Sequence, residues 1–537
     1  MTEVRVKEEE HIEDSTEKVP SKTGKHLIKL SSWQFIFFTA VVITLLSIIY
    51  VQTVMANWGI YGFSFDDSWI HVQYARTIFE GRAWQYTAGI PSTGSSGPLW
   101  SVVLAPIFLF GYDHDVIVTS VLAISGIFYI VSVFLVGEIV KQHTDRWEYA
   151  IIAQIVFVLV PRNAGLMLSG METPLGMMLI LLALLMLPKP EWKYDMVLGV
   201  VAGLVYLCRP EFVLIAAVLL PVRGLTVLYR SKIKSKRIFT LLLMFVAAAL
   251  VVTPWILHCL NTTGNPLPDS YYSKTRFGIS QEGIDYWDYY WFNVWFPLEP
   301  YLILGIVGSI VILARKRRPY ELLLISSLYV LYRLTMPGIS LLFAARYLVP
   351  LFNLMSIAFV CGIALIIEKL TTIPHDSIKF DMNERKILTL LITLCLFLPS
   401  IASSVGYTNI HANQAKNIEE MQVTLSLWIR NNIPEGEYIA TYDVGAIGYF
   451  ANGPVLDLYG LVTPVLLYDY NDTISQTAYL KSIGCRYVLY YVQWKWYVEF
   501  GVIQAGGNMT ELFRAHLDDN IVCGADDMAV YEIDWNI

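Results

Sequence analysis

Residues 34–67 read QFIFFTAVVITLLSIIYVQTVMANWGIYGFSFDD, a long apolar stretch that ends in two adjacent aspartates. No charged residue lies between Lys29 and Asp66. Residues 34–55 are enough to cross the hydrocarbon core of a bilayer, which is about 30 Å thick. A cleaved signal peptide would have a shorter apolar region followed by a small-residue cleavage site. The stretch therefore predicts a first transmembrane helix that stays in the protein.

The composition of the whole chain favours an integral membrane protein. Hydrophobic residues make up 55% of its 537 residues and charged residues only 15%, against roughly 25% charged residues in soluble domains. The mean hydropathy is +0.51. A soluble fold would have to expose much of this apolar surface, so the composition argues against one.

Further apolar runs bring the prediction to about eleven transmembrane helices. After the first helix they lie at 116–140, 148–162, 173–188, 194–208, 211–228, 238–260, 299–314, 319–336, 342–367 and 386–407. The basic loops RSKIKSKR (230–237) and ARKRRP (314–319) belong to the cytoplasmic side by the positive-inside rule. This orientation places the N-terminus in the cytoplasm and the C-terminus outside the cell membrane. An odd number of crossings is needed between a cytoplasmic N-terminus and an external C-terminus. The apolar segment 98–112 is therefore expected to lie along the membrane or to re-enter it without crossing.

The chain divides into three predicted parts. They are a disordered cytoplasmic tail (1–33), a transmembrane domain (34–407) with external loops at 56–115 and 261–298, and an extracytoplasmic domain (408–537). The last part carries 16 acidic and 6 basic side chains. Its short β-type runs EYIATYD, RYVLYYV and MAVYEI are separated by helical patterns, which predicts a small α/β domain.

The cysteines give no sign of a metal site. Six cysteines occur in the chain, and none shows the paired spacing typical of zinc ligands. No metal and no other cofactor are therefore predicted. Cys485 and Cys523 lie in the polar C-terminal part, and they can form a disulfide if that part is outside the cell.

Asp66 and Asp67 lie, by this topology, at the outer face directly after the first helix. The next residues place Ile70, Tyr74 and Ile78 on one side of a helix, which predicts an amphipathic helix lying on the membrane. Either aspartate can cap the start of this helix, which leaves the other unexplained. Two adjacent carboxylates repel each other, so the pKa of one of them rises. A carboxylate of that kind in a cleft suits a general base.

Other ionisable residues gather near the outer ends of predicted helices. A charge near hydrocarbon is costly, so such residues are candidates for a functional role. They are Glu172, Arg209, Glu211, Lys274 and Arg346. Converging arginines suit a phosphate group, because the guanidinium fork matches its oxygens. The simpler alternatives are a structural salt bridge between Arg209 and Glu211, and an Arg346 side chain that reaches to the membrane interface. The Gly- and Ser-rich loop at 86–100 is either a binding loop for an anion or sugar or a turn-rich connector.

Six motifs follow the paired aspartates in a fixed order. They are GIPSTGSSGPLW (89–100), SGMETPL (169–175), CRPEF (208–212), GNPLPDSYYSK (264–274), ARYLVP (345–350) and DVGAIGYFANGPVLDLYGL (443–461). This order resembles that of the GT-C membrane glycosyltransferases, especially the cell-wall terminal arabinofuranosyltransferases and related polyprenyl-phosphate-sugar transferases. Met171 stands where the family pattern SGLET has leucine, and PLPDSYYSK replaces PLPNTFYAK. These departures leave the donor sugar and the acceptor open.

The resemblance implies a GT-C fold and an inverting glycosyltransferase, which moves a single hexose or pentose from a polyprenyl-phosphate donor to a glycan, lipid or glycoprotein acceptor at the outer face. It implies that Asp66 or Asp67 is the base, with Asp66 the first choice. The substrate site would include Glu172 and Glu211, and the cations that stabilise the leaving phosphate without a metal would be Arg209, Lys274 and Arg346. Asp443 and Asp457 in the outer domain either face the same cavity or are structural. No nucleic acid partner is expected.

A polytopic transporter or lipid-sugar flippase is the alternative from another class. It predicts charges or helix breaks near the middle of the membrane, and often an inverted repeat. Here the charges gather at one membrane face and no repeat is visible. The pattern favours the enzyme and leaves the transporter open.

Overall fold

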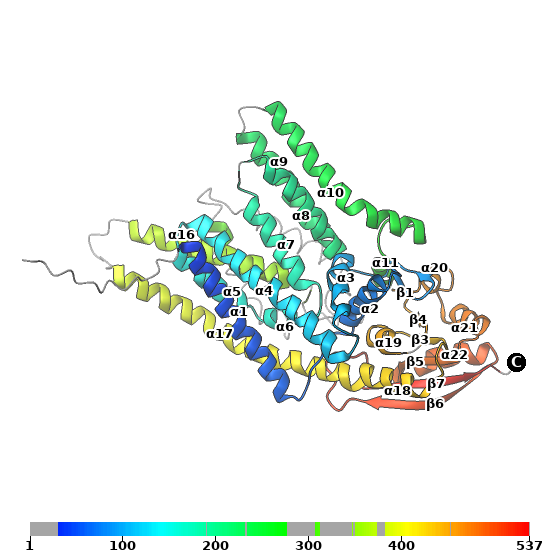
Figure 1. The fold of residues 1–537 in the computed structure, drawn as a ribbon. Helices are drawn as coiled ribbons and strands as arrows, with labels where there is room; N and C mark the ends of the chain where they lie inside the picture. The colour runs from blue at the N-terminus through cyan, green and yellow to red at the C-terminus, as the bar shows by residue number, and fades with distance from the viewer. Residues whose placement is uncertain are drawn as a thin grey trace, which may run out of the picture.

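A computed structural model describes residues 31–189, 191–230, 234–276, 305, 307–311, 346, 349–372, 382–451 and 453–535. The predicted tail at 1–33, the second half of the external loop 261–298, and the spans at 299–314 and 319–336 lie wholly or largely outside these residues. The described chain forms a bundle of long helices with a mixed α/β domain at one end (Figure 1).

The helices of the bundle follow the predicted apolar runs. They are α1 (Ser32–Asn57), α4 (His114–Thr144), α5 (Trp147–Leu159), α7 (Thr173–Met186), α8 (Lys193–Cys208), α9 (Val213–Arg230), α10 (Lys234–Thr263), α16 (Val349–Thr372) and α17 (Met382–Ile418). Among the described residues, Ser32–Asn57, His114–Thr144 and Ile238–Thr263 are long and apolar enough to cross a membrane, and shorter apolar helices accompany them. Helices of membrane-spanning length and composition are thus observed among the described residues, whereas the number of about eleven crossings stays a prediction.

Glycines let α8 and α10 pack closely. A Cβ at Gly199 would lie 2.2 Å from the carbonyl oxygen of Met244, and one at Gly203 would lie 2.7 Å from the Cβ of Val251. Membrane helices associate through small residues of this kind, because their backbones can then approach each other. The tightly packed α8 carries Arg209 at its C-terminal end.

The helix α17 continues from the bundle into the C-terminal domain. It is longer than the predicted span 386–407, and a π-helical turn (Glu419–Val423) joins it to α18 (Thr424–Asn432). Its 37 residues extend over about 55 Å at 1.5 Å per residue, well beyond the roughly 30 Å of a hydrocarbon core. The last turns of α17 therefore connect the two parts of the molecule (Figure 1).

The C-terminal domain contains a five-stranded sheet of order β4-β3-β5-β7-β6. Its strands are β3 (Ile439–Thr441), β4 (Val455–Asp457), β5 (Tyr487–Tyr491), β6 (Asn508–His516) and β7 (Asp527–Asp534), and its helices after α18 are α19 (Gly445–Phe450), α20 (Pro464–Tyr468), α21 (Thr473–Ser482) and α22 (Lys495–Gln504). β3 runs parallel to β4 and β5, whereas β7 is antiparallel to β5 and β6. The three predicted β-type runs are β3, β5 and β7, and the sequence reading missed β4 and β6.

The disulfide considered between Cys485 and Cys523 is not formed. Both thiols are free. Cys485 packs with Val488 on one face of β5, whereas Cys523 packs with Leu489 on the opposite face. The sheet itself separates the two sulfur atoms, so this pair cannot crosslink the folded domain.

Helix α2 (Asp67–Phe79) begins at the paired aspartates as predicted, but it does not lie with one face on a membrane. All residues from Ser68 to Ala75 are buried. The short helices α3 (Pro98–Leu104) and η1 (Ala105–Leu109), the hairpin of β1 (Gln85–Thr87) and β2 (Ile90–Pro91), and α19 of the C-terminal domain surround it. Trp69 stacks on Tyr449 of α19 with 5.1 Å between the ring centroids. The apolar spacing thus serves burial between two parts of the protein.

Candidate active site

Asp66 holds the C-terminal domain against the start of α2. Its backbone is helical, and its side chain does not cap its own helix. Instead, its two carboxylate oxygens accept hydrogen bonds from the backbone amides of Gly445, at 2.6 Å, and Ala446, at 2.8 Å. These amides begin α19, so Asp66 caps a helix that lies far away in the sequence. A Cβ at position 445 would lie 2.0 Å from the carbonyl oxygen of Asp66, so this approach requires glycine.

A second carboxylate, Asp443, lies close to Asp66. Asp443 accepts hydrogen bonds from the side-chain amide of Gln422, at 2.8 Å, and from the hydroxyl of Tyr491, at 2.6 Å. Burial raises the pKa of Asp66 well above its usual range, and the negative charges of Asp443 and Asp67 add to this, although the two backbone amides act to lower it. The contact between Asp66 and α19 therefore brings negative charges together, and the two backbone amides compensate them only in part.

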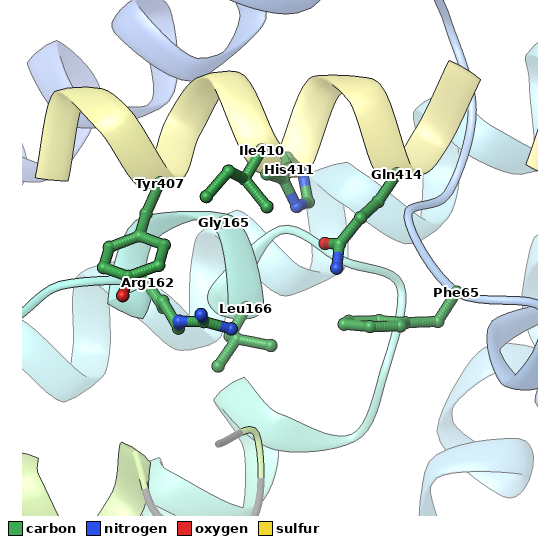
Figure 2. A pocket seen from close by; sticks show the side chains of 8 residues that line it. All are labelled: Phe65, Arg162, Gly165, Leu166, Tyr407, Ile410, His411 and Gln414. Atoms are coloured by element: carbon green, nitrogen blue, oxygen red, sulfur yellow. The ribbon is translucent and has the colours of Figure 1, made fainter. Parts of the chain in front are cut away.

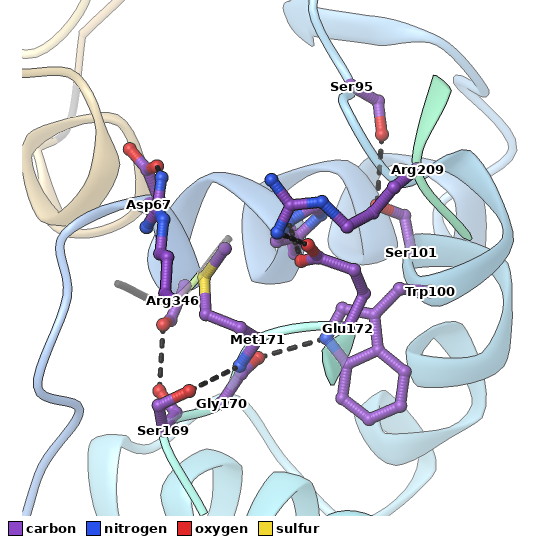
Figure 3. A network of polar contacts seen from close by, with 12 residues as sticks. Asp67, Ser95, Trp100, Ser101, Ser169, Gly170, Met171, Glu172, Arg209 and Arg346 are labelled. Atoms are coloured by element: carbon purple, nitrogen blue, oxygen red, sulfur yellow. Dashed lines mark hydrogen bonds and ion pairs between the residues drawn. The ribbon is translucent and has the colours of Figure 1, made fainter. Parts of the chain in front are cut away.

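Asp67 faces a different partner. Its Oδ2 lies 2.5 Å from a terminal nitrogen of Arg346 (Figure 3). The Asp67 side chain is 28% exposed, whereas that of Arg346 is 2% exposed. The Arg346 guanidinium also lies over the ring of Phe65, 5.3 Å from its centroid. Both aspartates are half-buried, but Arg346 orients the carboxylate of Asp67, whereas amides of α19 hold that of Asp66.

A buried ionic network lies beside this pair. Glu172, at the start of α7, accepts from Arg209 at 2.7 Å and lies 3.1 Å from Nε2 of His71 on α2. Arg209 also pairs with Glu211 at 2.7 Å. Although burial acts to raise the pKa of Glu172, Arg209 and His71 lower it to about 2. The network holds the ends of α7 and α8 against α2.

The loop that carries Glu172 is fixed from both sides. The hydroxyl of Ser68 donates to the carbonyl of Ser169 at 2.8 Å, and the indole of Trp100 donates to the carbonyl of Gly170 at 2.9 Å. Gly170 has a φ of +84°, which favours glycine. The SGMET motif is therefore a turn that depends on glycine and is held between α2 and α3 (Figure 3).

The Gly- and Ser-rich loop has its hydroxyls turned inward. Ser92 is 2.8 Å from the hydroxyl of Tyr74, and the hydroxyl of Thr93 accepts from the backbone amide of Asp269 at 3.0 Å. Asp269 begins α11 (Asp269–Arg276) and accepts from Tyr468 of the C-terminal domain at 2.9 Å. Burial raises the pKa of Asp269. This loop, α11 and the C-terminal domain therefore meet at one junction.

Five of the predicted site residues fall into two groups, whereas Asp66 contacts α19. Asp67 and Arg346 form one, and Glu172, Arg209 and Glu211 form the other. Lys274 belongs to α11, but its side chain lies outside the described part of the structure. Asp457 is buried and accepts backbone amides of its own turn, including that of Val462 at 2.9 Å, so it has a structural role.

Sequence reasoning missed His71. It lies four positions after Asp67, so the two share one face of α2, and this spacing would have indicated it. No group of three or more His, Cys, Asp or Glu residues is arranged to hold a metal within the part of the chain that the structure describes. The expected absence of a metal stays a prediction.

Comparisons with known proteins identify the fold. A family model described as a domain of unknown function (DUF8728) matches residues 410–531, and no curated protein matches the sequence. The crystal structure of ArnT from Cupriavidus metallidurans bound to undecaprenyl phosphate is similar, with 12% identity, 93% of this chain and 98% of that chain covered, and a TM-score of 0.57. The apo oligosaccharyltransferase from Archaeoglobus fulgidus matches with 12% identity, 86% and 70% coverage, and a TM-score of 0.52.

An Archaeoglobus fulgidus oligosaccharyltransferase complex with Zn and sulfate matches at 14% identity, 86% and 68% coverage, and a TM-score of 0.50. Both relatives are GT-C superfamily membrane glycosyltransferases. The predicted GT-C fold is therefore confirmed. At these identities the likeness concerns the fold alone.

Proposed function

We propose that this protein is an inverting glycosyltransferase that moves one sugar from a polyprenyl-phosphate donor to an acceptor hydroxyl at the outer membrane face. The GT-C fold supports this class of reaction, since one structural relative was crystallised with undecaprenyl phosphate. The observation that carries the proposal is the Asp67 carboxylate, which is accessible and held by Arg346 where the helical bundle meets the C-terminal domain.

We assign the base to Asp67, although the sequence alone favoured Asp66. A general base must bring an oxygen within about 2.6–3.2 Å of the acceptor hydroxyl. Both oxygens of Asp66 already accept amides of α19. The Asp67 side chain is 28% exposed, and Arg346 orients its carboxylate. Asp66 then positions the C-terminal domain, and Asp67 reacts.

In the reaction, Asp67 takes the proton of the acceptor hydroxyl as its oxygen forms a bond to the anomeric carbon. The bond from that carbon to the donor phosphate breaks on the opposite face. The phosphate keeps the electron pair and leaves as polyprenyl phosphate. Configuration at the anomeric carbon is inverted by this single displacement.

The positions of base and leaving group separate the roles of the cations. The acceptor oxygen lies about 3–3.5 Å from the anomeric carbon in a near-attack geometry, so the leaving oxygen is beyond that carbon as seen from Asp67. Arg346 contacts Asp67 itself and is therefore assigned to orienting the base. Arg209 is held between Glu172 and Glu211 and is assigned to the scaffold. Lys274, predicted for the leaving phosphate, keeps that role in the proposal.

The proposed orientation places the N-terminus in the cytoplasm and the C-terminal domain outside. That domain forms one wall of the site, because α19 lies on α2. An acceptor glycan, lipid or glycoprotein would reach Asp67 along this wall, and the transferred unit would be a hexose or a pentose.

The test begins with the natural substrates. Mass spectrometry of surface glycans and lipid-linked sugars from a deletion strain names the missing sugar and its acceptor. Purified protein is then given the matching polyprenyl-phosphate sugar, with the Asp67→Asn variant beside the parent. A variant that transfers sugar at the parent's rate would disprove the base. A deletion strain with unchanged glycans and lipid-linked sugars would disprove the function.

A further inference from the structure

Three parallel strands of the C-terminal sheet, β4, β3 and β5, end at the same edge. The helix α19, between β3 and β4, lies on one face of the sheet, where Ile447 belongs to the same buried cluster as Leu489 of β5. The helix α21, between β4 and β5, lies on the other face, where Leu480 belongs to the cluster of Val488. The chain thus leaves β3 toward β4 and then crosses to the opposite neighbour, β5. Open α/β sheets bind ligands outside the carboxyl ends of their strands at such a reversal.

An aromatic residue follows each of these three strands. Tyr459 follows β4, Tyr442 follows β3 and Trp494 follows β5. The ring centroid of Tyr442 lies 5.0 Å from that of Tyr459 and 5.9 Å from that of Trp494. All three side chains are half-buried. The rings therefore form a row across the carboxyl ends of the strands.

The helix α22 adds two more rings to this row. Trp496 is 70% exposed and Tyr497 is 46% exposed, and their ring centroids are 5.5 Å apart. Burial raises the pKa of Tyr442, and Tyr497 adds to this, so Tyr497 lies beside the row. We call the five residues together the aromatic edge: Tyr442, Tyr459, Trp494, Trp496 and Tyr497.

Hydrogen bonds fix the turns that carry the aromatic edge. The carboxylate of Asp457 accepts from the backbone amide of Tyr459 at 2.8 Å. The hydroxyl of Thr441 accepts from the backbone amide of Asp443 at 3.1 Å, directly after Tyr442. Rings that are already held in place lose little conformational freedom when a ligand binds, which favours binding.

The aromatic edge is continuous with the proposed reaction site. The rings of Trp494 and Tyr491 have their centroids 4.9 Å apart, and the Tyr491 hydroxyl donates to Asp443 at 2.6 Å. Asp443 lies close enough to Asp66 to add to the effect of burial on its pKa, and Asp67 is the next residue. A ligand on the aromatic edge would therefore extend toward the carboxylate that takes the proton.

The charge and the shape of this surface define its ligand. The C-terminal domain carries 16 acidic and 6 basic side chains, which disfavours an anionic polymer or an anionic bilayer surface. Figure 1 shows α22 beyond the ends of α4, α8 and α10, away from the bundle. Tyrosine and tryptophan combine a flat apolar face with a polar tip. An uncharged saccharide matches them, because its ring faces carry C–H groups and its hydroxyls lie around the rim.

The enclosed alternative for such a ligand is a pocket between α17 and the short helix α6 (Asn163–Met167). Its lining includes Phe65, Leu166 and Ile410 (Figure 2). Its empty volume is about 280 Å³, including the part open to solvent, which is below the roughly 300–1,000 Å³ of ordinary ligand pockets. A saccharide chain therefore fits the open aromatic edge better than this pocket.

We propose that the aromatic edge binds an uncharged saccharide chain stacked along its rings, and that it selects a glycan as the acceptor. The second part rests on the proposed function, because an acceptor is needed only if sugar is transferred. The first part does not, so binding is measured without any donor.

The test uses the full-length protein in nanodiscs. The probes are the neutral and the anionic oligosaccharides released from the surface glycans of the native strain, and chemically deglycosylated surface protein. Trp496→Ala and Trp494→Leu each remove one ring and should raise the Kd for the neutral oligosaccharides about five- to ten-fold. Trp496 is exposed, so its replacement carries little risk to folding.

Trp192→Ala is the matched control. Trp192 is also an exposed tryptophan, at 61%. It precedes α8, at the end of that helix remote from Arg209. Its substitution should leave the Kd unchanged.

A Kd for the neutral oligosaccharides that rises in both edge variants and not in Trp192→Ala supports the proposal. Three results overturn it. They are no measurable binding of the neutral oligosaccharides, equal or tighter binding of the anionic oligosaccharides or the deglycosylated protein, and a Kd that either edge variant leaves unchanged.

Asp67→Asn separates this proposal from the proposed function. The variant should bind the neutral oligosaccharides as the parent does and lose sugar transfer. Parental transfer by Asp67→Asn would disprove the base and leave the aromatic edge standing. Sugar transfer by a parent protein that binds no saccharide would overturn the aromatic edge and leave the enzyme standing.

Discussion

Separate asparagine substitutions of the paired aspartates should have opposite consequences. Asp67→Asn keeps the shape of the side chain and an oxygen for Arg346, so the fold should remain intact. The general base is lost, however, and such groups contribute about 10²–10⁴-fold to rate, or about 3–5 kcal/mol of barrier. Initial rates of sugar transfer with purified protein measure this loss.

Asp66→Asn should retain most of the activity. Asparagine has one acceptor oxygen, so one of the two bonds to Gly445 and Ala446 is lost, which costs about 1.5–3 kcal/mol for a charged acceptor. The same change removes the repulsion from Asp443 and the burial of a charge. Because the pKa of Asp66 is raised in spite of both amide bonds, these unfavourable effects outweigh the bonds. The net effect on stability should therefore be small at neutral pH.

The pH dependence of stability provides a second measurement. The pKa of Asp66 is higher in the folded protein than the ordinary value of 3.8 for an aspartate, so the folded state binds the proton more tightly. Its contribution to stability is therefore greatest at low pH and is lost as pH rises from the unfolded pKa through the folded pKa. The difference in thermal stability between parent and Asp66→Asn should change with pH in that window, as scanning fluorimetry can record.

The outcomes separate the two residues. Loss of transfer in Asp66→Asn with full transfer in Asp67→Asn would reverse the assignment. Full transfer in both variants would show that neither aspartate is the general base. A pH-independent stability difference would refute the electrostatic account of the junction.

Three further results are expected. Gly445→Ala should lower the free energy of unfolding by about 1–3 kcal/mol through packing strain, because its Cβ would lie 2.0 Å from the Asp66 carbonyl oxygen. Limited proteolysis would detect a loosened C-terminal domain. An unchanged digest would contradict the close approach. Arg209→Met should destabilise the protein by about 3–5 kcal/mol, because Glu172 is left buried with its charge. The double variant with Glu172→Met should recover much of the thermal stability. The absence of recovery would argue against energetic coupling between Arg209 and Glu172. Chelation of divalent metals with EDTA should leave the transfer rate unchanged, and inhibition reversed by added metal would show that the predicted metal independence is wrong.

The sequence predicted the helical part well, because long uncharged runs such as 34–55 have few alternatives to a membrane helix. It also singled out both aspartates and the ion-paired residues Glu172, Arg209 and Glu211, but it missed His71. It misjudged α2, because the same apolar spacing fits a helix on a membrane and a helix covered by another domain. The contacts that distinguish the two, such as that of Trp69 with α19, come from segments remote in the chain.

The roles of Asp66 and Asp67 could not be separated from the sequence for a related reason. Adjacent residues in a helix point in directions about 100° apart, so each meets different partners. Those partners, Gly445 and Arg346, lie hundreds of residues away. Strand β6 was missed because it is an exposed edge strand with few apolar residues, so it lacks the pattern by which strands are recognised.

The bond between Asp66 and Gly445 joins residues 379 positions apart. At a synthesis rate of about 5–20 residues per second, roughly 20–75 s pass before the ribosome supplies the partner of a segment made near the start. During this interval α2 lacks the helix that covers Trp69, and the site has no second wall. A chain that terminates early therefore lacks the contacts from α19 to Asp66 and Trp69. The site around Asp66 and Asp67 is therefore completed only after the final quarter of the protein has been made.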